Sequence, residues 1–172
     1  MESAIELLAK FQTGLVGLIG FTGVITTLIV NARLERRRLR EAREHERNTL
    51  TRALLAELRS HHLSVEANDQ QVRRADPTEY PTLILPAHNP TPVFDANIAR
   101  LGLLSDKQID PVLRAYLLIK EHDRKLELIT VRTSDDHRSL AVEKHGHLLA
   151  GMLEGLLPEL DAAIKALRGP SP

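Results

Sequence analysis

The pattern of apolar and polar positions divides the chain into an apolar stretch, a basic stretch and three striped segments. Residues 13 to 30 contain no charged residue. A helix needs about 20 apolar residues to cross the hydrocarbon core of a bilayer, since each residue adds about 1.5 Å. Leu, Ile, Val and Phe near its centre each favour insertion by about 0.3 to 0.6 kcal/mol. The pattern therefore predicts a transmembrane helix over residues 13–30, preceded by a short segment, residues 1–12, outside the cell.

Two other interpretations of this stretch are a cleaved export signal and the buried first helix of a soluble domain. A signal peptide begins with basic residues and has a shorter apolar core, whereas residues 1–12 contain two glutamates and one lysine. A buried helix of a soluble protein usually shows a polar face. We therefore expect a membrane anchor.

A run of arginines follows the apolar stretch directly. Residues 31–48 contain seven arginines and four glutamates, and basic residues at the end of a transmembrane helix favour the cytoplasmic side. The N-terminus is then expected outside and the C-terminal domain in the cytoplasm. Residues 31–48 are predicted to form a basic juxtamembrane helix, whose arginines lie at the membrane surface among the lipid headgroups: Arg33, Arg36, Arg37, Arg38 and Arg40.

Small residues recur within the apolar stretch. Gly17, Gly20 and Gly23 are three residues apart, and Thr27 follows Gly23 by four. Small residues at such spacings let helix backbones approach closely in membranes. Gly and Thr are also common in these helices for other reasons, so both explanations stay open. We expect the helix to associate either with copies of itself or with a membrane-protein partner.

Three amphipathic stripes follow the basic segment. Their apolar positions advance by threes and fours over residues 50–72, 112–129 and 145–167. Such stripes can be buried only against one another, which predicts an antiparallel helical bundle over residues 49–168 and a tail at 169–172. No alternating pattern of strand length appears. The expected fold is all-α: an N-terminal transmembrane helix continues into a long cytoplasmic helix that packs in the bundle.

Prolines and caps predict the breaks between these helices. Five prolines between residues 77 and 93 predict an extended strap. A short helix from Phe94 to Leu101 should end at Gly102 in the left-handed conformation.

Two further signals predict helix starts. Ser105 and Gln108 have the spacing of a capping box. Asp110 followed by Pro111 is a good start for another helix. Residues 133–136 form a turn with several capping candidates, after which the last helix should begin.

One segment resembles a known group of proteins. The run Phe94-x-x-Asn97-x-x-x-Leu101-Gly102-Leu103-Leu104, with Tyr116 further on, is similar to a pattern in small uncharacterised bacterial proteins that carry one N-terminal membrane anchor. The resemblance covers about residues 92–120 and the general layout. It implies a single-pass protein of the bacterial inner membrane and implies no activity. We expect Asn97 to have a structural role, since Asn side chains commonly bond nearby backbone.

Composition and motifs favour no catalytic chemistry. The chain has no cysteine, which excludes disulfides, thiolate metal sites and cysteine nucleophiles. Its eight histidines do not form an HExxH motif, and its glycines form no phosphate-binding loop. The balanced charge and the few aromatic residues argue against nucleic-acid binding. We expect no metal, no cofactor and no enzymatic activity.

The architecture predicts a membrane-anchored scaffold or adaptor that is not an enzyme. Two alternatives follow from the same pattern. One is a holin-like or defence effector that assembles through its Gly/Thr-rich anchor and perturbs the membrane. The other is a regulatory subunit of a larger membrane complex.

Overall fold

The computed structural model describes residues 4–75, 82–86 and 90–169, and among residues 4–20 it describes the side chains of Phe11, Val16 and Leu18. The chain forms two compact units, Met1–His45 and Glu46–Pro172. Helix α1 (Ala4–Arg74) runs through the first unit and provides the first element of the second. Residues 24–74 contain neither Gly nor Pro, so nothing in the sequence interrupts the helix there.

The prediction of a membrane-spanning helix over residues 13–30 is wrong, and with it the location in a bacterial inner membrane. In the described part of the chain, no helix is long and apolar enough to cross a membrane. Side chains are described without interruption from Phe21, and 18 residues from there reach Arg38. That stretch includes four arginines and Glu35, and each charged residue strongly opposes insertion.

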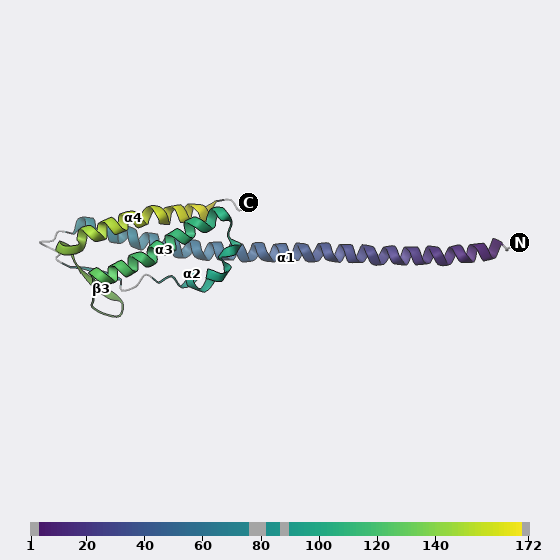
Figure 1. Cartoon of the computed structure of the whole chain (residues 1–172), viewed down its shortest axis with the longest axis horizontal. Coiled ribbons are helices and arrows are strands. Elements are labelled where there is room, and N and C mark those ends of the chain that lie inside the picture. Colours follow the sequence, from purple (N-terminus) through teal and green to yellow (C-terminus); the bar gives the residue numbers. More distant parts are fainter. Residues whose placement is uncertain (1–3, 76–81, 87–89, 170–172) are drawn as a thin grey trace. The chain divides into compact units, whose positions relative to one another are not determined.

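The second unit is built mainly from three packed helices, as the striped pattern predicts. The last part of α1 lies beside α3 (Asp106–Ile129) and α4 (Val142–Arg168) (Figure 1). Helices α3 and α4 are antiparallel, and Gln108 near the start of α3 bonds the Ala166 carbonyl near the end of α4. Their common core contains the predicted stripe residues that are buried: Leu50, Leu54, Leu58, Val65, Val72, Val112, Tyr116, Ile119, Leu126, Leu149, Leu156, Leu160, Ala163 and Leu167.

Helix α3 begins at the predicted capping box. The Ser105 backbone N–H donates to Gln108 Oε1 at 3.2 Å, and the helix starts at Asp106. The second predicted start, at Asp110–Pro111, is wrong because Pro111 lies inside the same helix. A proline removes a single backbone donor near a helix start, and here the packing of the following turns against α4 keeps the helix continuous.

The segment before α3 is helical over a longer range than predicted, and its second half is a tighter 3₁₀ helix. Helix α2 (Pro92–Asn97) is followed by a 3₁₀ helix, η1 (Ile98–Leu103), which contains Gly102. The prediction of a left-handed Gly102 is wrong, because no described glycine has a positive φ. In a 3₁₀ helix, each backbone carbonyl accepts a hydrogen bond from the N–H group three residues later. The chain can therefore continue from α2 toward α3 without a residue in the left-handed conformation.

A small sheet corrects the expectation that the chain has no strands. Strands β1 (Thr82–Pro86), β3 (His137–Ala141) and β2 (Val131–Arg132) form an antiparallel sheet in the order β1-β3-β2. The register pairs Leu83 with Leu140, and both side chains are buried. Strand β1 lies within the predicted proline strap, residues 77–93, parts of which (77–81 and 87–89) lie outside the described residues.

Candidate functional site

The first unit exposes an apolar seam on α1. Leu18, Phe21, Ile25 and Leu28 follow one another at steps of three, four and three, which is the spacing of a coiled-coil interface. All four are exposed, with Phe21 at 67% and Leu28 at 60% of their full surface. We call these four residues the α1 seam. Large apolar side chains arranged in this way usually mark a contact surface.

The same stretch of α1 also carries small residues, and their polar groups are satisfied. The hydroxyls of Thr22, Thr26 and Thr27 donate to the backbone carbonyl four residues earlier, each at 2.8 Å. A Cβ atom added at Gly23 would meet nothing within 4 Å. Gly23 and Thr27 lie on the face away from the seam together with Val30, which is 47% exposed, and that face is uncharged. The side chains at the other two predicted association positions, Gly17 and Gly20, lie outside the described residues.

The arginine run follows the seam on the same helix. Arg33, Arg36, Arg37, Arg38 and Arg40 are all exposed. Arg37 Nε donates to Glu41 Oε1 at 2.8 Å, a pair four residues apart. Exposed pairs of this kind stabilise a helix by about 0.3 to 0.5 kcal/mol. The predicted role of these arginines at a lipid surface stays a prediction.

In the second unit, Glu57 of α1 holds the start of α2. The backbone N–H groups of Val93 and Phe94 donate to its two carboxylate oxygens at 2.8 and 3.0 Å. The hydroxyl of Tyr116 donates to the same carboxylate at 2.7 Å. The first N–H groups of a helix have no partner within the helix, and its N-terminus favours a negative charge. Glu57 thus caps α2 from a different element.

An aromatic pair lies next to this cap. The rings of Phe94 and Tyr116 stack with their centroids 4.0 Å apart. Burial and the nearby Glu57 carboxylate raise the pKa of Tyr116, which keeps the hydroxyl protonated as a donor. Lys120 pairs with Asp95 of α2 at 2.5 Å and lowers the pKa of that carboxyl. These contacts join α1, α2 and α3 at one point.

The remaining residues of the FxxNxxxLGLL segment lie beside the pair. Asn97 Nδ2 donates to the carbonyl of Val93 at 2.8 Å, and Asn97 Oδ1 accepts from Arg100 at 3.3 Å. Leu101 is buried in the core, while Gly102 is exposed and has open space around it. The segment therefore connects α2 to α3 through packing and local hydrogen bonds.

A buried polar cluster joins the sheet to α3. Arg138 of β3 is 3% exposed, pairs with Asp123 of α3 and donates from Nε to the Pro86 carbonyl at 2.7 Å. His122, beside Asp123, is 5% exposed. Burial, together with the positive charge of Arg138, lowers the pKa of His122 to about 4. The ring is therefore neutral at physiological pH.

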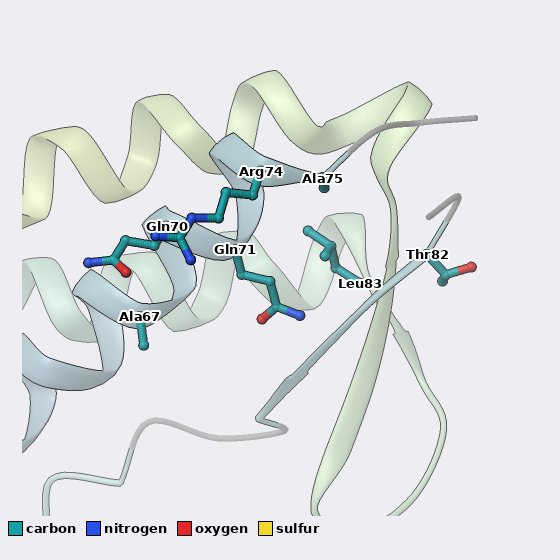
Figure 2. Close-up of a pocket in the computed structure, with 7 residues that line it drawn as sticks. All are labelled: Ala67, Gln70, Gln71, Arg74, Ala75, Thr82 and Leu83. Atoms are coloured by element: carbon teal, nitrogen blue, oxygen red, sulfur yellow. The ribbon is translucent and has the colours of Figure 1, made fainter. Parts of the chain in front are cut away.

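A pocket of about 390 Å³ lies between the end of α1 and strand β1 (Figure 2). Gln71 of α1 and Leu83 of β1 extend into the space between the two elements, and Gln70 and Arg74 supply further polar groups. The seven described lining residues include two amides, one guanidinium and the Thr82 hydroxyl, but no carboxylate or imidazole. This set can hydrogen-bond a ligand but contains no general acid or base.

The charged and polar residues of these sites were missed in the sequence because their partners lie on distant elements. No sequence motif contains Glu57, His122 or Arg138. Only Arg138 carried a local signal, because it occupies a buried position of a strand in which buried and more exposed residues alternate. Comparisons of the chain with protein-family models, with curated proteins and with solved structures gave no match.

Proposed function

We propose that this protein is a non-enzymatic scaffold that assembles with further copies of itself through the α1 seam. Each copy would contribute the helical domain formed by residues 46–172 as a surface for other partners. The observation that carries the proposal is the exposure of Leu18, Phe21, Ile25 and Leu28 at coiled-coil spacing.

The chemistry of the seam favours a second copy as its partner. The four side chains are uncharged, and the threonine hydroxyls behind them already bond their own backbone. A symmetric pair of identical helices places equivalent apolar residues against each other, and most oligomers of soluble proteins are symmetric in this way.

The expected strength follows from the buried side chains. Each large apolar side chain contributes about 1.5 to 3 kcal/mol when fully buried. The seam residues of two copies then contribute roughly 12 to 24 kcal/mol. Association costs about 4 to 15 kcal/mol in lost translational and rotational freedom. At the midpoints of the two ranges, about 18 and about 10 kcal/mol, the remainder is about 8 kcal/mol, which corresponds to association at micromolar concentration and is sensitive to loss of a few side chains.

Sedimentation equilibrium of the full-length protein tests the proposal. The native chain should sediment as an oligomer, and the variant with Ile25→Gln and Leu28→Gln should associate at least about a hundred-fold more weakly, because four buried side chains are lost from each pair of helices. The matched control, Thr26→Gln with Val30→Gln, changes neighbouring positions off the seam and should sediment as the native chain does.

Three results would overturn the proposal. The first is a native chain that sediments as a monomer. The second is a native chain that floats with phosphatidylcholine vesicles and no longer associates with other copies there, which would show that the seam contacts lipid. The third comes from the seam variant. A seam variant that sediments like the native chain would show that these four residues do not form the interface.

A further inference from the structure

The small sheet has an open edge at β1, where no further strand pairs with it in the described part of the chain. The strand order β1-β3-β2 places β3 on one side of β1 only. An edge strand presents unpaired backbone N–H and C=O groups that can pair with a strand of another chain. The pocket of about 390 Å³ lies beside β1, and none of its described lining residues belongs to β3. The pocket therefore lies on the side of β1 that faces α1, away from β3 (Figure 2).

The register of the sheet shows which neighbour each backbone group of the central strand β3 faces. Thr133, directly after β2, donates its N–H to the carbonyl of His137 at 3.1 Å. Along an antiparallel strand, the backbone groups of successive residues point to the two sides in alternation. Two residues after His137, Ser139 therefore faces its partner Val131 of β2. The backbone groups of the intervening Arg138 face β1.

The same alternation places two pairs of backbone groups of β1 on its open side. Leu83 and Leu85 pair with the residues of β3 that face β1, so their backbone groups are used within the sheet. The N–H and C=O groups of Thr82 and Ile84 point away from β3 and have no partner among the described residues. Pro86 closes the other end of this edge, because proline has no N–H to donate. An incoming strand can therefore pair with Thr82 and Ile84.

The pocket beside this edge offers space and polar groups to an extended chain. From α1, Ala67 and Ala75 contribute only methyl side chains, and Gln71 extends toward β1 (Figure 2). Arg74 is the one charged residue among the described lining residues; it is exposed and forms no ion pair within the described part of the chain. A guanidinium binds a carboxylate through charge-assisted hydrogen bonds. The occupant is therefore expected to carry a negative charge near Arg74.

We infer that this edge binds an extended segment of a partner protein, which adds a strand antiparallel to β1 and places an acidic residue next to Arg74. The backbone of β1 selects this class of occupant, because only an extended chain presents N–H and C=O groups at the spacing of Thr82 and Ile84. The whole described sheet is antiparallel, and antiparallel pairing is the more stable arrangement.

The pleat of β1 also determines the side-chain pattern of the partner segment. Residues directly opposite each other in an antiparallel pair direct their side chains to the same face. Ile84 is 52% exposed, so the partner residue opposite it lies at the surface and can be polar. The partner residues on either side lie on the face of the buried Leu83, beside the pocket, and are expected to be apolar. The segment thus alternates apolar and polar residues and is acidic at an end.

Fluorescence anisotropy of a labelled heptapeptide, EVTVTVE, with the full-length protein tests this surface. The native chain should bind it saturably, with one peptide per chain. The peptide KVTVTVK should bind at least about five-fold more weakly, because its lysines meet Arg74. Arg74→Gln should bind the two peptides about equally. The matched control, Arg59→Gln, replaces an exposed arginine of α1 outside the pocket and should discriminate between them as the native chain does.

The backbone pairing is tested on both partners. In the antiparallel arrangement the threonines of the peptide direct their N–H groups toward β1, so N-methylation of both threonines should abolish binding. N-methylation of the first two valines, which face away from β1, should leave it largely intact. Ile84→Pro removes a donor that the sheet does not use. It should weaken binding at least about ten-fold, while the melting temperature stays close to that of the native chain.

A second pair of variants keeps the site testable if Ile84→Pro unfolds. Ala67→Leu fills the pocket and should weaken binding, whereas Ala56→Leu, at an exposed position of α1 outside the pocket, should not. The site is independent of the α1 seam, so the variant with Ile25→Gln and Leu28→Gln should bind the peptide like the native chain.

Four results would overturn the inference. They are absence of saturable binding to the native chain, equal effects of the two N-methylation patterns, equal affinities of the native chain for the two peptides, and unchanged binding in Ala67→Leu. A change of the sedimenting mass in Ile84→Pro would show that a second copy of the chain occupies the edge, and the inference would be wrong.

Discussion

Removing the Glu57 carboxylate should destabilise the second unit more than any other single exposed or half-buried charge on α1. The carboxylate accepts from the N–H groups of Val93 and Phe94 and from the hydroxyl of Tyr116, at distances between 2.7 and 3.0 Å. The variant Glu57→Ala leaves all three donors without their acceptor. It also removes the negative charge from the N-terminus of α2.

The magnitude follows from these three hydrogen bonds. Bonds to a charged group contribute about 1.5 to 3 kcal/mol each, and the half-buried position of Glu57 reduces that value because water can reach the freed groups. We expect a loss of about 3 to 4 kcal/mol in the free energy of unfolding. Whole domains have about 5 to 15 kcal/mol, so the loss would be a large fraction of the total.

Urea unfolding of the full-length protein, followed by far-ultraviolet circular dichroism, measures this loss. Glu66→Ala is the matched control, since Glu66 is an exposed glutamate of α1 whose one ion pair, to His62, is 3.9 Å long. It should change the free energy of unfolding by less than about 0.5 kcal/mol. A loss below about 1 kcal/mol for Glu57→Ala would refute the capping role.

A double-mutant cycle identifies the cause. Tyr116→Phe removes only the hydroxyl and should cost about 1 to 2 kcal/mol in the native background. In the Glu57→Ala background it should cost almost nothing, because the acceptor is already absent. If the losses in the free energy of unfolding are additive, the Tyr116 hydroxyl and the Glu57 carboxylate do not interact.

Two further outcomes are expected of the buried polar cluster. The pKa of His122 falls from 6.5 to about 4 on folding, so stability is fully present above pH 6.5 and is lost as the pH falls toward about 4. Urea unfolding measured across this pH range should show a loss of about 2 to 3 kcal/mol in the free energy of unfolding. The loss should be smaller in His122→Phe. Equal losses in the two proteins would contradict the assignment of this pH dependence to His122. Arg138→Met should lower the free energy of unfolding by about 3 to 5 kcal/mol, since Asp123 and the Pro86 carbonyl lose a buried partner. In a thermal melt, the exposed control Arg132→Met should differ little from the native chain, and a similar melting temperature for Arg138→Met would count against the buried pair.

The helices of the second unit could be read from the sequence because their signals are local. The stripe that includes Leu50, Leu54 and Leu58 advances at the helical period and is buried as predicted. The capping box of Ser105 and Gln108 acts over three residues and is also confirmed. In both cases the information lies within one or two turns of the chain.

Three predictions made from local sequence signals are wrong. Gly102 follows an apolar turn, as a left-handed cap would, but a 3₁₀ helix continues through it. Pro111 after Asp110 suits a helix start, yet the helix begins earlier, at Asp106. The apolar stretch that begins at residue 13 was assigned to a membrane from its composition, and no described helix meets the requirements of a span.

Only the tertiary structure decided the sheet and the polar contacts. Strand β1 pairs with β3, which lies beyond three helices (α2, η1 and α3) and a further strand. Two strands of five residues have too few alternating positions to be recognised separately. Glu57 becomes a cap only because α2 returns to α1 at that point. The pKa of His122 is lowered by Arg138 only because β3 returns to α3 at that point. Periodicity determines which face of an element is apolar, whereas the partner of a polar side chain depends on which distant segment packs beside it.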